Sequence, residues 1–180
     1  KSEFNVGWAI TAAKRDLCDG CDVDHDFTKT IFDAYLEGRT LITNQADLAD
    51  ILVQRDIVMN TWEKVVAAVT IHYVNDVAAD IAGIIAAGDT TAMPGSDATA
   101  DYENHWGEMR GYANGLLYND FKVIEDANLN RIYAVMGTAP VYPSNGNFDD
   151  MQAYHDSLVG EVRAIFQASY GFSAANVANW

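Results

Sequence analysis

The chain has 180 residues, enough for one domain with a proper hydrophobic core, and 49% of them are hydrophobic. Its 11 basic and 26 acidic side chains give a formal net charge of -15. Such a charge repels phosphate backbones and anionic lipid, which argues against nucleic-acid binding and against docking on a membrane surface. The most apolar stretch, 65–87, is interrupted by polar residues, so no transmembrane segment is expected.

Helical periodicity dominates the chain, and alternating strand patterns are nearly absent. A first helix is expected after the N-cap Ser2 and through 8–17, and a second helix begins at the cap Asp26 and stops at Gly38. One long helix, or a kinked pair, is then predicted over 45–87 because apolar residues recur at helical spacing. Its stripe consists of Val58, Trp62, Val65, Val69, His72 and Asp76.

The second half is predicted to hold three more helices, over 98–118, 129–136 and 148–169. The turn-forming run 88–97 and the proline-containing run 138–147 separate them, and the tail to Trp180 is expected to be irregular. Several long helices with short loops, each with one apolar stripe, are typical of an up-and-down bundle. We therefore predict a single all-α domain of long antiparallel helices over 1–180.

A helical His-x-x-Glu pair, His105 and Glu108, is the most chemically suggestive feature. This spacing places an imidazole and a carboxylate side by side on one helix face. On the predicted long helix, His72 and Asp76 are four residues apart and continue the apolar stripe. If the two helices are neighbours, the four side chains form a nitrogen and oxygen set that suits a divalent metal such as iron, zinc or copper.

A structural role explains the same residues without any ligand. A half-buried histidine is commonly hydrogen-bonded to a carboxylate, and such a pair can hold two helices in register. The sequence therefore leaves two functions open: a protein that binds a divalent metal or small ligand, and a non-catalytic structural or protein-interaction module of the cell surface.

Catalytic signatures are missing from the sequence. It contains no His-Glu-x-x-His zinc-protease motif, no Gly-x-Ser-x-Gly elbow, and no phosphate-binding or dinucleotide-binding glycine pattern. Hydrolase, kinase and dehydrogenase activities therefore have no support, and we do not expect an enzyme.

The only two cysteines, Cys18 and Cys21, lie in an acidic Cys-Asp-Gly-Cys segment. Neighbouring aspartates would raise a thiol pKa, which disfavours a redox motif. We favour a local disulfide that closes a loop over two free thiols, which supports an exported protein. The acidic run 22–26 resembles the start of a calcium loop, but Phe27 stands where that loop needs glycine, so a solvated loop with a helix cap at Asp26 is favoured.

Several runs resemble an uncharacterised branch of the imelysin-like exported bacterial proteins. The central ones are Trp-Glu-Lys at 62–64, Ile-His-Tyr-Val-Asn-Asp at 71–76 and His-Trp-Gly-Glu-Met-Arg-Gly-Tyr-Ala at 105–113. Segments 2–5, 13–16, 26–28 and 32–39 fit the same pattern, so the resemblance spans Ser2 to about Pro140.

The resemblance implies a helical-bundle lipoprotein or other exported protein of Gram-negative bacteria, in the periplasm or at the outer membrane or cell surface. Some imelysin relatives look like iron-uptake accessory proteins with a His-x-x-Glu motif, which maps here onto His105 and Glu108. Family members are about twice as long, so this chain looks like a C-terminal half. Glu103-Asn104 precedes His105 where the family has Gly-x, and the family's peptidase activity is not carried over.

Overall fold

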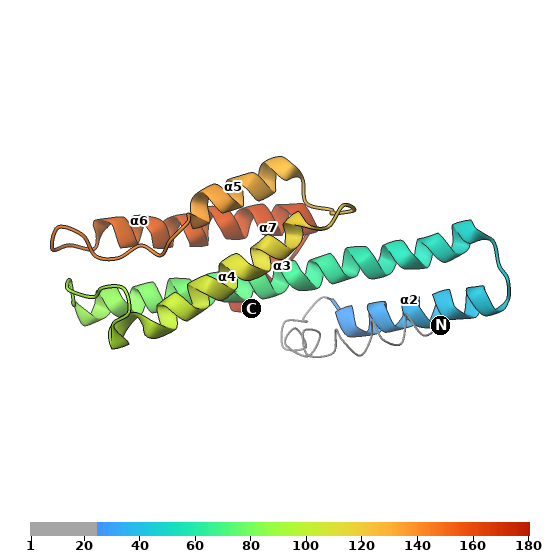
Figure 1. Ribbon diagram of the computed structural model, residues 1–180, viewed down its shortest axis with the longest axis horizontal. Helices are drawn as coiled ribbons and strands as arrows, with labels where there is room; N and C mark the ends of the chain where they lie inside the picture. Colours follow the sequence, from blue (N-terminus) through green and yellow to red (C-terminus); the bar gives the residue numbers. More distant parts are fainter. Residues whose placement is uncertain (1–24) are drawn as a thin grey trace.

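The computed structural model describes residues 25–180, and every regular element in that range is a helix (Figure 1). The predicted first helix and the pair Cys18 and Cys21 lie outside the described residues. In chain order the elements are α2 (Phe27–Thr43), α3 (Leu48–Ala87), the 3-10 turn η1 (Asp97–Thr99), α4 (Ala100–Leu117), α5 (Asp126–Met136), α6 (Asp149–Ser157), the π-helical turn η2 (Leu158–Val162), α7 (Arg163–Tyr170) and α8 (Ala174–Asn179). The predicted all-α bundle is confirmed.

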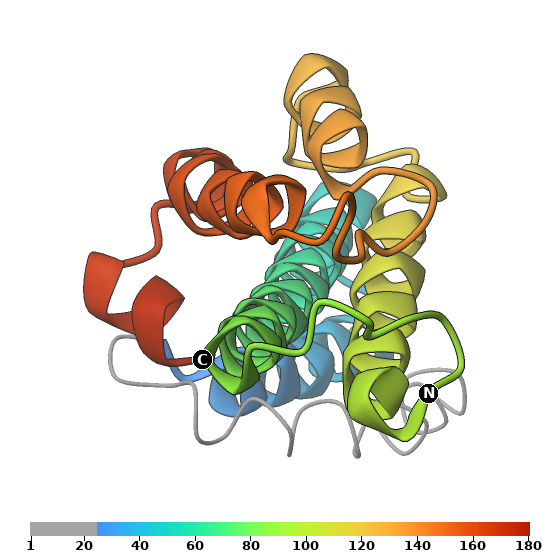
Figure 2. The ribbon, with the colours of Figure 1, turned by 90° about the vertical axis from the view of Figure 1, so that its left-hand side faces the viewer.

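The long helix α3 is the axis of the molecule, and it is a single helix of 40 residues. The end-on view in Figure 2 shows α3 between α4 on one side and the consecutive helices α6 and α7 on the other. One face of its middle section is apolar and buried, as at Val65, Ile71, Val74 and Ile81. Length and apolar composition alone would let α3 cross a membrane, but 56% of its most apolar window is buried inside the protein, as in a core helix.

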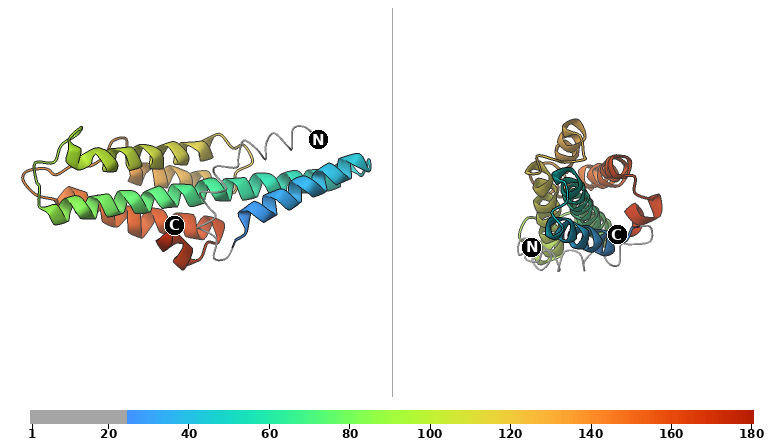
Figure 3. Two further views of the ribbon diagram at one scale, coloured as in Figure 1. Left: turned by 90° about the horizontal axis from the view of Figure 1, so that it is seen from below. Right: turned by 90° about the vertical axis from the view of Figure 1, so that its right-hand side faces the viewer.

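Helix α2 runs antiparallel to α3, and the two form a hairpin that extends beyond the rest of the bundle (Figure 3). Asp26 caps α2 by accepting a hydrogen bond from the Lys29 amide at 2.7 Å, as predicted. The predicted stop at Gly38 is wrong, because Gly38 is buried within the helix, which continues to Thr43. Thr40 and Thr43 are compatible with that last turn because each hydroxyl donates to a carbonyl four residues earlier.

Helix α5 begins at Asp126 and not at the predicted Leu129. The Leu129 amide already donates to the Glu125 carbonyl at 3.0 Å, so helical hydrogen bonding starts one turn earlier than the apolar pattern indicates. An acidic residue in the first turn, here Asp126, is favourable at the positive end of the helix dipole. Gly137 ends the helix with a φ of 72°, in agreement with the prediction.

The predicted last long helix is present as α6, η2 and α7 in continuous succession, from Asp149 to Tyr170. The sequence did not predict its π-helical turn, in which the Arg163 amide bonds to the Leu158 carbonyl. The buried residues Leu158, Val162, Phe166 and Tyr170 recur every four positions. Because an α-helix repeats every 3.6 residues, the wider π turn helps to keep this stripe facing the core.

The predicted irregular tail instead forms the short helix α8, which Ser173 caps by accepting from the Asn176 amide at 3.1 Å. Two hydrogen bonds attach it to α3: the Asn75 side-chain amide donates to the carbonyls of Val177, at 3.2 Å, and Trp180, at 2.7 Å. The expectation that aromatic residues pack the tail down is confirmed by Trp180, which is 7% exposed and lies edge-on to Phe172.

Candidate functional site

The candidate site lies where α4 crosses α3, and the two helices are neighbours as the metal hypothesis requires. They run antiparallel in a register that places His105 beside Asp80, Tyr112 against Tyr73 and Gly115 near Val66. This register decides which of the predicted site residues meet.

His105 pairs with Asp80, a residue that the sequence did not indicate. Its Nδ1 lies 2.7 Å from Asp80 Oδ2, and the side chain is 29% exposed, so it lines the seam between the helices and not the core. Burial lowers the pKa of His105, but the hydrogen bond and charge of Asp80, with the charges of Asp76 and Asp101, outweigh it and leave that pKa raised above 6.5. The carboxylate of Asp80 on the neighbouring helix therefore favours the protonated form of the His105 imidazole.

His72 and Asp76 pair with each other, and the distance from His72 Nε2 to Asp76 Oδ2 is 3.2 Å. The His72 side chain is 42% exposed and that of Asp76 is 34% exposed. His72 and Asp80 are eight residues apart, which on an α-helix is about 12 Å along the axis and about 80° of rotation. Since His105 faces Asp80, it cannot also face His72. The two histidines therefore belong to two separate pairs.

Glu108 accepts a hydrogen bond from the Tyr73 hydroxyl. Burial, followed by that hydrogen bond and the charge of Glu108, raises the pKa of Tyr73 to about 12. The Tyr73 ring stacks on Tyr112 at 5.5 Å and lies 6.2 Å from the His105 ring. Tyr73 thus contacts both predicted pairs, since its ring also lies 5.0 Å from the His72 ring.

No group of three or more His, Cys, Asp or Glu side chains that could hold a metal ion occurs among residues 25–180. The four predicted ligands, His72, Asp76, His105 and Glu108, lie along one seam but are engaged with Asp80 and Tyr73 as well as with each other. A single-ion centre would require them to turn away from these partners.

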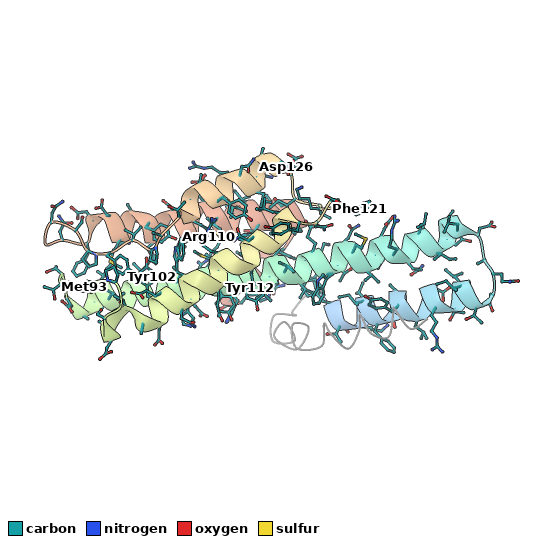
Figure 4. The ribbon with its side chains drawn as sticks, in the orientation of Figure 1. Met93, Tyr102, Arg110, Tyr112, Phe121 and Asp126 are labelled. Carbon is teal, nitrogen blue, oxygen red and sulfur yellow. The ribbon has the colours of Figure 1, made fainter. Side chains whose placement is uncertain are left out.

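A cleft of about 370 Å³ opens beside Asp80, at the end of the molecule where Figure 4 labels Met93 and Tyr102. We call it the acidic cleft, because four aspartates and no basic side chain are among its lining residues. Its walls are the C-terminal end of α3, the loop over 88–96 and the start of α4. The lining residues are Ala79, Asp80, Gly83, Ile84, Ala87, Asp89, Ala92, Asp97, Ala98, Asp101 and Tyr102.

The loop that borders the acidic cleft is fixed to α4 by Glu103. This carboxylate accepts from the Gly95 amide at 2.7 Å, the Thr99 hydroxyl at 2.8 Å and the Tyr142 hydroxyl at 3.0 Å. The hydrogen bond from Gly95, then that from Thr99, holds the pKa of Glu103 below its usual range. The cleft wall is therefore held in a defined conformation.

Like charges surround Asp80, which links the acidic cleft to His105. Burial raises the pKa of Asp80, and the nearby carboxylates of Asp76 and Asp101 add to that increase against the opposing effect of His105. A carboxyl group with a perturbed pKa at the wall of a cleft is a common feature of binding sites.

Glu63 is a second important residue that sequence reasoning missed, and it lies on α3 outside the acidic cleft. It is 3% exposed, and its carboxylate accepts from the Val123 and Ile124 amides, the Asn119 side chain and the Tyr170 hydroxyl. It thereby joins α3 to the turn after α4 and to α7. The sequence offered one signal for this role, because Glu63 is a charged residue on the apolar, buried side of a helix.

Comparison of the chain with protein-family models gave no match, and comparisons with curated proteins and with solved structures gave none either.

Proposed function

We propose that this protein is a non-catalytic binding module that takes a small organic cation in the acidic cleft between α3 and α4. The observation that carries the proposal is the cleft itself: about 370 Å³, with four aspartates and no basic residue among its lining side chains. Small-molecule sites in proteins are typically clefts of roughly 300–1,000 Å³ with mostly apolar walls and a few polar groups. The cleft fits that description.

Charge favours a cation there. The C-terminal end of α3 brings the negative end of its helix dipole to the cleft, and four aspartates outweigh the positive dipole end at the start of α4, which also lines it. Within the described part of the chain, no hydrogen bond or short ion pair engages the carboxylates of Asp97 and Asp101, so both are available to a ligand. A cation bound between them and Asp80 would offset the repulsion among these like charges.

The apolar part of the lining favours an organic cation over a bare metal ion. A metal ion needs several donors converging at about 2.0–2.6 Å, whereas the aspartates of the cleft are distributed over α3, the loop and the start of α4. Ala79, Ile84 and Ala87 supply a surface for an aliphatic arm. An alkylammonium group meets both requirements.

Isothermal titration calorimetry with n-butylammonium chloride tests the proposal, with 1-butanol as the uncharged analogue. We expect saturable binding of the amine, none of the alcohol, and roughly tenfold weaker binding for the Asp97→Asn/Asp101→Asn variant, since each carboxylate contributes a charge-assisted contact. Asp47→Asn/Asp50→Asn, which removes two exposed charges far from the cleft, is the matched control. Equal binding of amine and alcohol, or an equal loss in the control, contradicts the proposal.

Parallel titrations with zinc, iron and copper test the divalent-metal alternative predicted from the His-x-x-Glu pair. Saturable metal binding that is lost in His105→Ala would favour it over the organic cation. The imelysin-like relationship and the exported location expected from the central motifs stay predictions. Both are compatible with a module that captures a small ligand outside the cytoplasm.

A structural or protein-interaction role is the second candidate, because each predicted ligand already has a partner inside the protein. Under that role, His105→Ala lowers the melting temperature while every titration stays featureless. The titrations therefore distinguish the candidates, because only a binding module gives saturable heat with the amine.

A further inference from the structure

The turn between α4 and α5 exposes four apolar side chains on one short segment. Tyr118 is 86% exposed, Phe121 60%, Leu117 46% and Val123 41%. We call these four residues the aromatic turn. Figure 4 labels Phe121 at this turn, where α4 ends partway along α3, and Met93 at the far end of the molecule beside the acidic cleft. Exposed apolar residues gathered in this way mark interaction sites more often than singly scattered ones do.

The aromatic turn is held rigidly from beneath. The buried carboxylate of Glu63 accepts from the Val123 amide at 2.8 Å, the Ile124 amide at 3.1 Å and the Asn119 side chain at 2.8 Å. Asn119 also accepts from the Phe121 amide at 2.9 Å, and Ile124 is an apolar anchor at 1% exposure. A turn with these bonds loses little conformational freedom when its outward side chains are bound.

Acidic groups border the aromatic turn. Asp120 lies within it and Glu125 follows it, both exposed, and neither forms an ion pair in the part of the chain that the structure describes. The two nearby cations are already engaged, Lys122 with Asp126 at 3.0 Å and Arg55 with Asp56 at 2.6 Å. The rest of the chain adds to a net charge of -15. The surface is therefore apolar at its centre, where the only charge that residues 25–180 place on the Phe121 ring is the guanidinium of Arg55, itself paired with Asp56, and it carries two unpaired carboxylates at its rim.

We propose that the aromatic turn is a docking site for a polypeptide partner whose apolar surface is flanked by lysine or arginine residues. Tyr118 and Phe121 enter the partner's apolar surface, and Asp120 and Glu125 pair with its basic rim. Aromatic residues dominate binding energy at protein interfaces, and complementary charge at the rim speeds association and selects the partner. Arg55, whose guanidinium lies over one face of the Phe121 ring at 5.5 Å from its centre, holds that ring by a cation–π contact.

The experiment selects peptides on the full chain from a random library displayed on phage, and then measures the affinity of synthetic copies by fluorescence anisotropy. We expect a consensus of apolar residues flanked by lysine or arginine. The Tyr118→Ser/Phe121→Ser variant should lose affinity about tenfold or more. Met93→Ser, which replaces a side chain that is 61% exposed at the other end of the molecule, should bind as the parent does. Circular dichroism confirms that each variant is folded.

Charge is tested separately with Asp120→Asn/Glu125→Gln. This variant should weaken binding severalfold at low ionic strength and lose that difference in high salt, because salt screens exposed charges. Selection of peptides without basic residues, or unchanged affinity in the Tyr118→Ser/Phe121→Ser variant, overturns the proposal.

Two other occupants are distinguished by the same variants. A concentration-dependent dimer in size-exclusion chromatography that is lost in Tyr118→Ser/Phe121→Ser would assign the turn to a second copy of this chain, and co-sedimentation with anionic vesicles that is lost in it would assign the turn to a membrane. Either result contradicts a basic polypeptide partner. Amine binding in the acidic cleft is independent of all these outcomes.

Discussion

His105 Nδ1 lies 2.7 Å from Asp80 Oδ2, and this contact joins α4 to α3 beside the acidic cleft. Asp80 is shared by the pair and by the cleft lining, so the protonation of one histidine and the charge of the cleft are linked.

Asp80→Asn should lower the pKa of His105. The hydrogen bond and charge of Asp80 are the main effects that raise this pKa, while burial, which lowers it, remains in the variant. An NMR titration of the imidazole C–H signals measures the shift. Asp156→Asn removes the partner of His155 on α6, at 2.9 Å, and should leave the His105 titration unchanged. A His105 pKa that is the same in Asp80→Asn and in the parent contradicts the assignment.

The stabilisation from His105 and Asp80 should decline as the pH rises. Because the folded-state pKa of His105 is raised above 6.5, the pair contributes fully below pH 6.5 as long as Asp80 is ionised, and it loses its contribution as the pH rises through the raised value of His105. Urea unfolding of the parent and of His105→Gln over a range of pH measures the difference in free energy of unfolding. We expect that difference to be largest at mildly acidic pH and to shrink at alkaline pH. A difference that grows with pH would have the wrong sign.

Glu63→Gln should lower the free energy of unfolding by about 2–3 kcal/mol, because an amide cannot accept from all the buried donors that the carboxylate serves. Urea denaturation measures the loss. Glu161→Gln is the matched control: its partner Arg131 is exposed, with Nη2 2.7 Å from Oε2, and such surface pairs contribute below about 1 kcal/mol. Similar losses in both variants would show that burial of Glu63 is not the cause.

Asn75→Ala should release α8 from α3. The variant loses the two hydrogen bonds to the carbonyls of Val177 and Trp180, at a cost of about 1–2 kcal/mol. Hydrogen exchange of the amides over 174–180 should become faster, while the middle of α3 stays protected. Asn179→Ala, whose side chain bonds only to the Ala175 carbonyl within the same helix, is the comparison variant. Equal exchange in Asn75→Ala and in the parent would contradict the attachment.

The sequence by itself determined the local elements. Helical periodicity predicted a long helix or a kinked pair where α3 lies, placed α4 within two residues at each end, and identified Met109, Ala113 and Leu116 as core positions that are 0–1% exposed. These properties depend on residues within one or two turns of each other. The predicted end of α2 at Gly38 was wrong because this glycine is buried within the helix, which continues past it. The predicted start of α5 at Leu129 was wrong because the helix begins one turn earlier, at the acidic residue Asp126.

Only the tertiary structure decided which side chains meet. The sequence gives the three-residue spacing of His105 and Glu108, but the structure pairs His105 with Asp80 on the neighbouring helix, and that partner was not predictable. An antiparallel pair of helices can be shifted by one turn without changing either apolar stripe, and such a shift exchanges Asp76 for Asp80 opposite His105. The role of Glu63 depends on donors more than 50 residues away in sequence, and no local pattern records that separation.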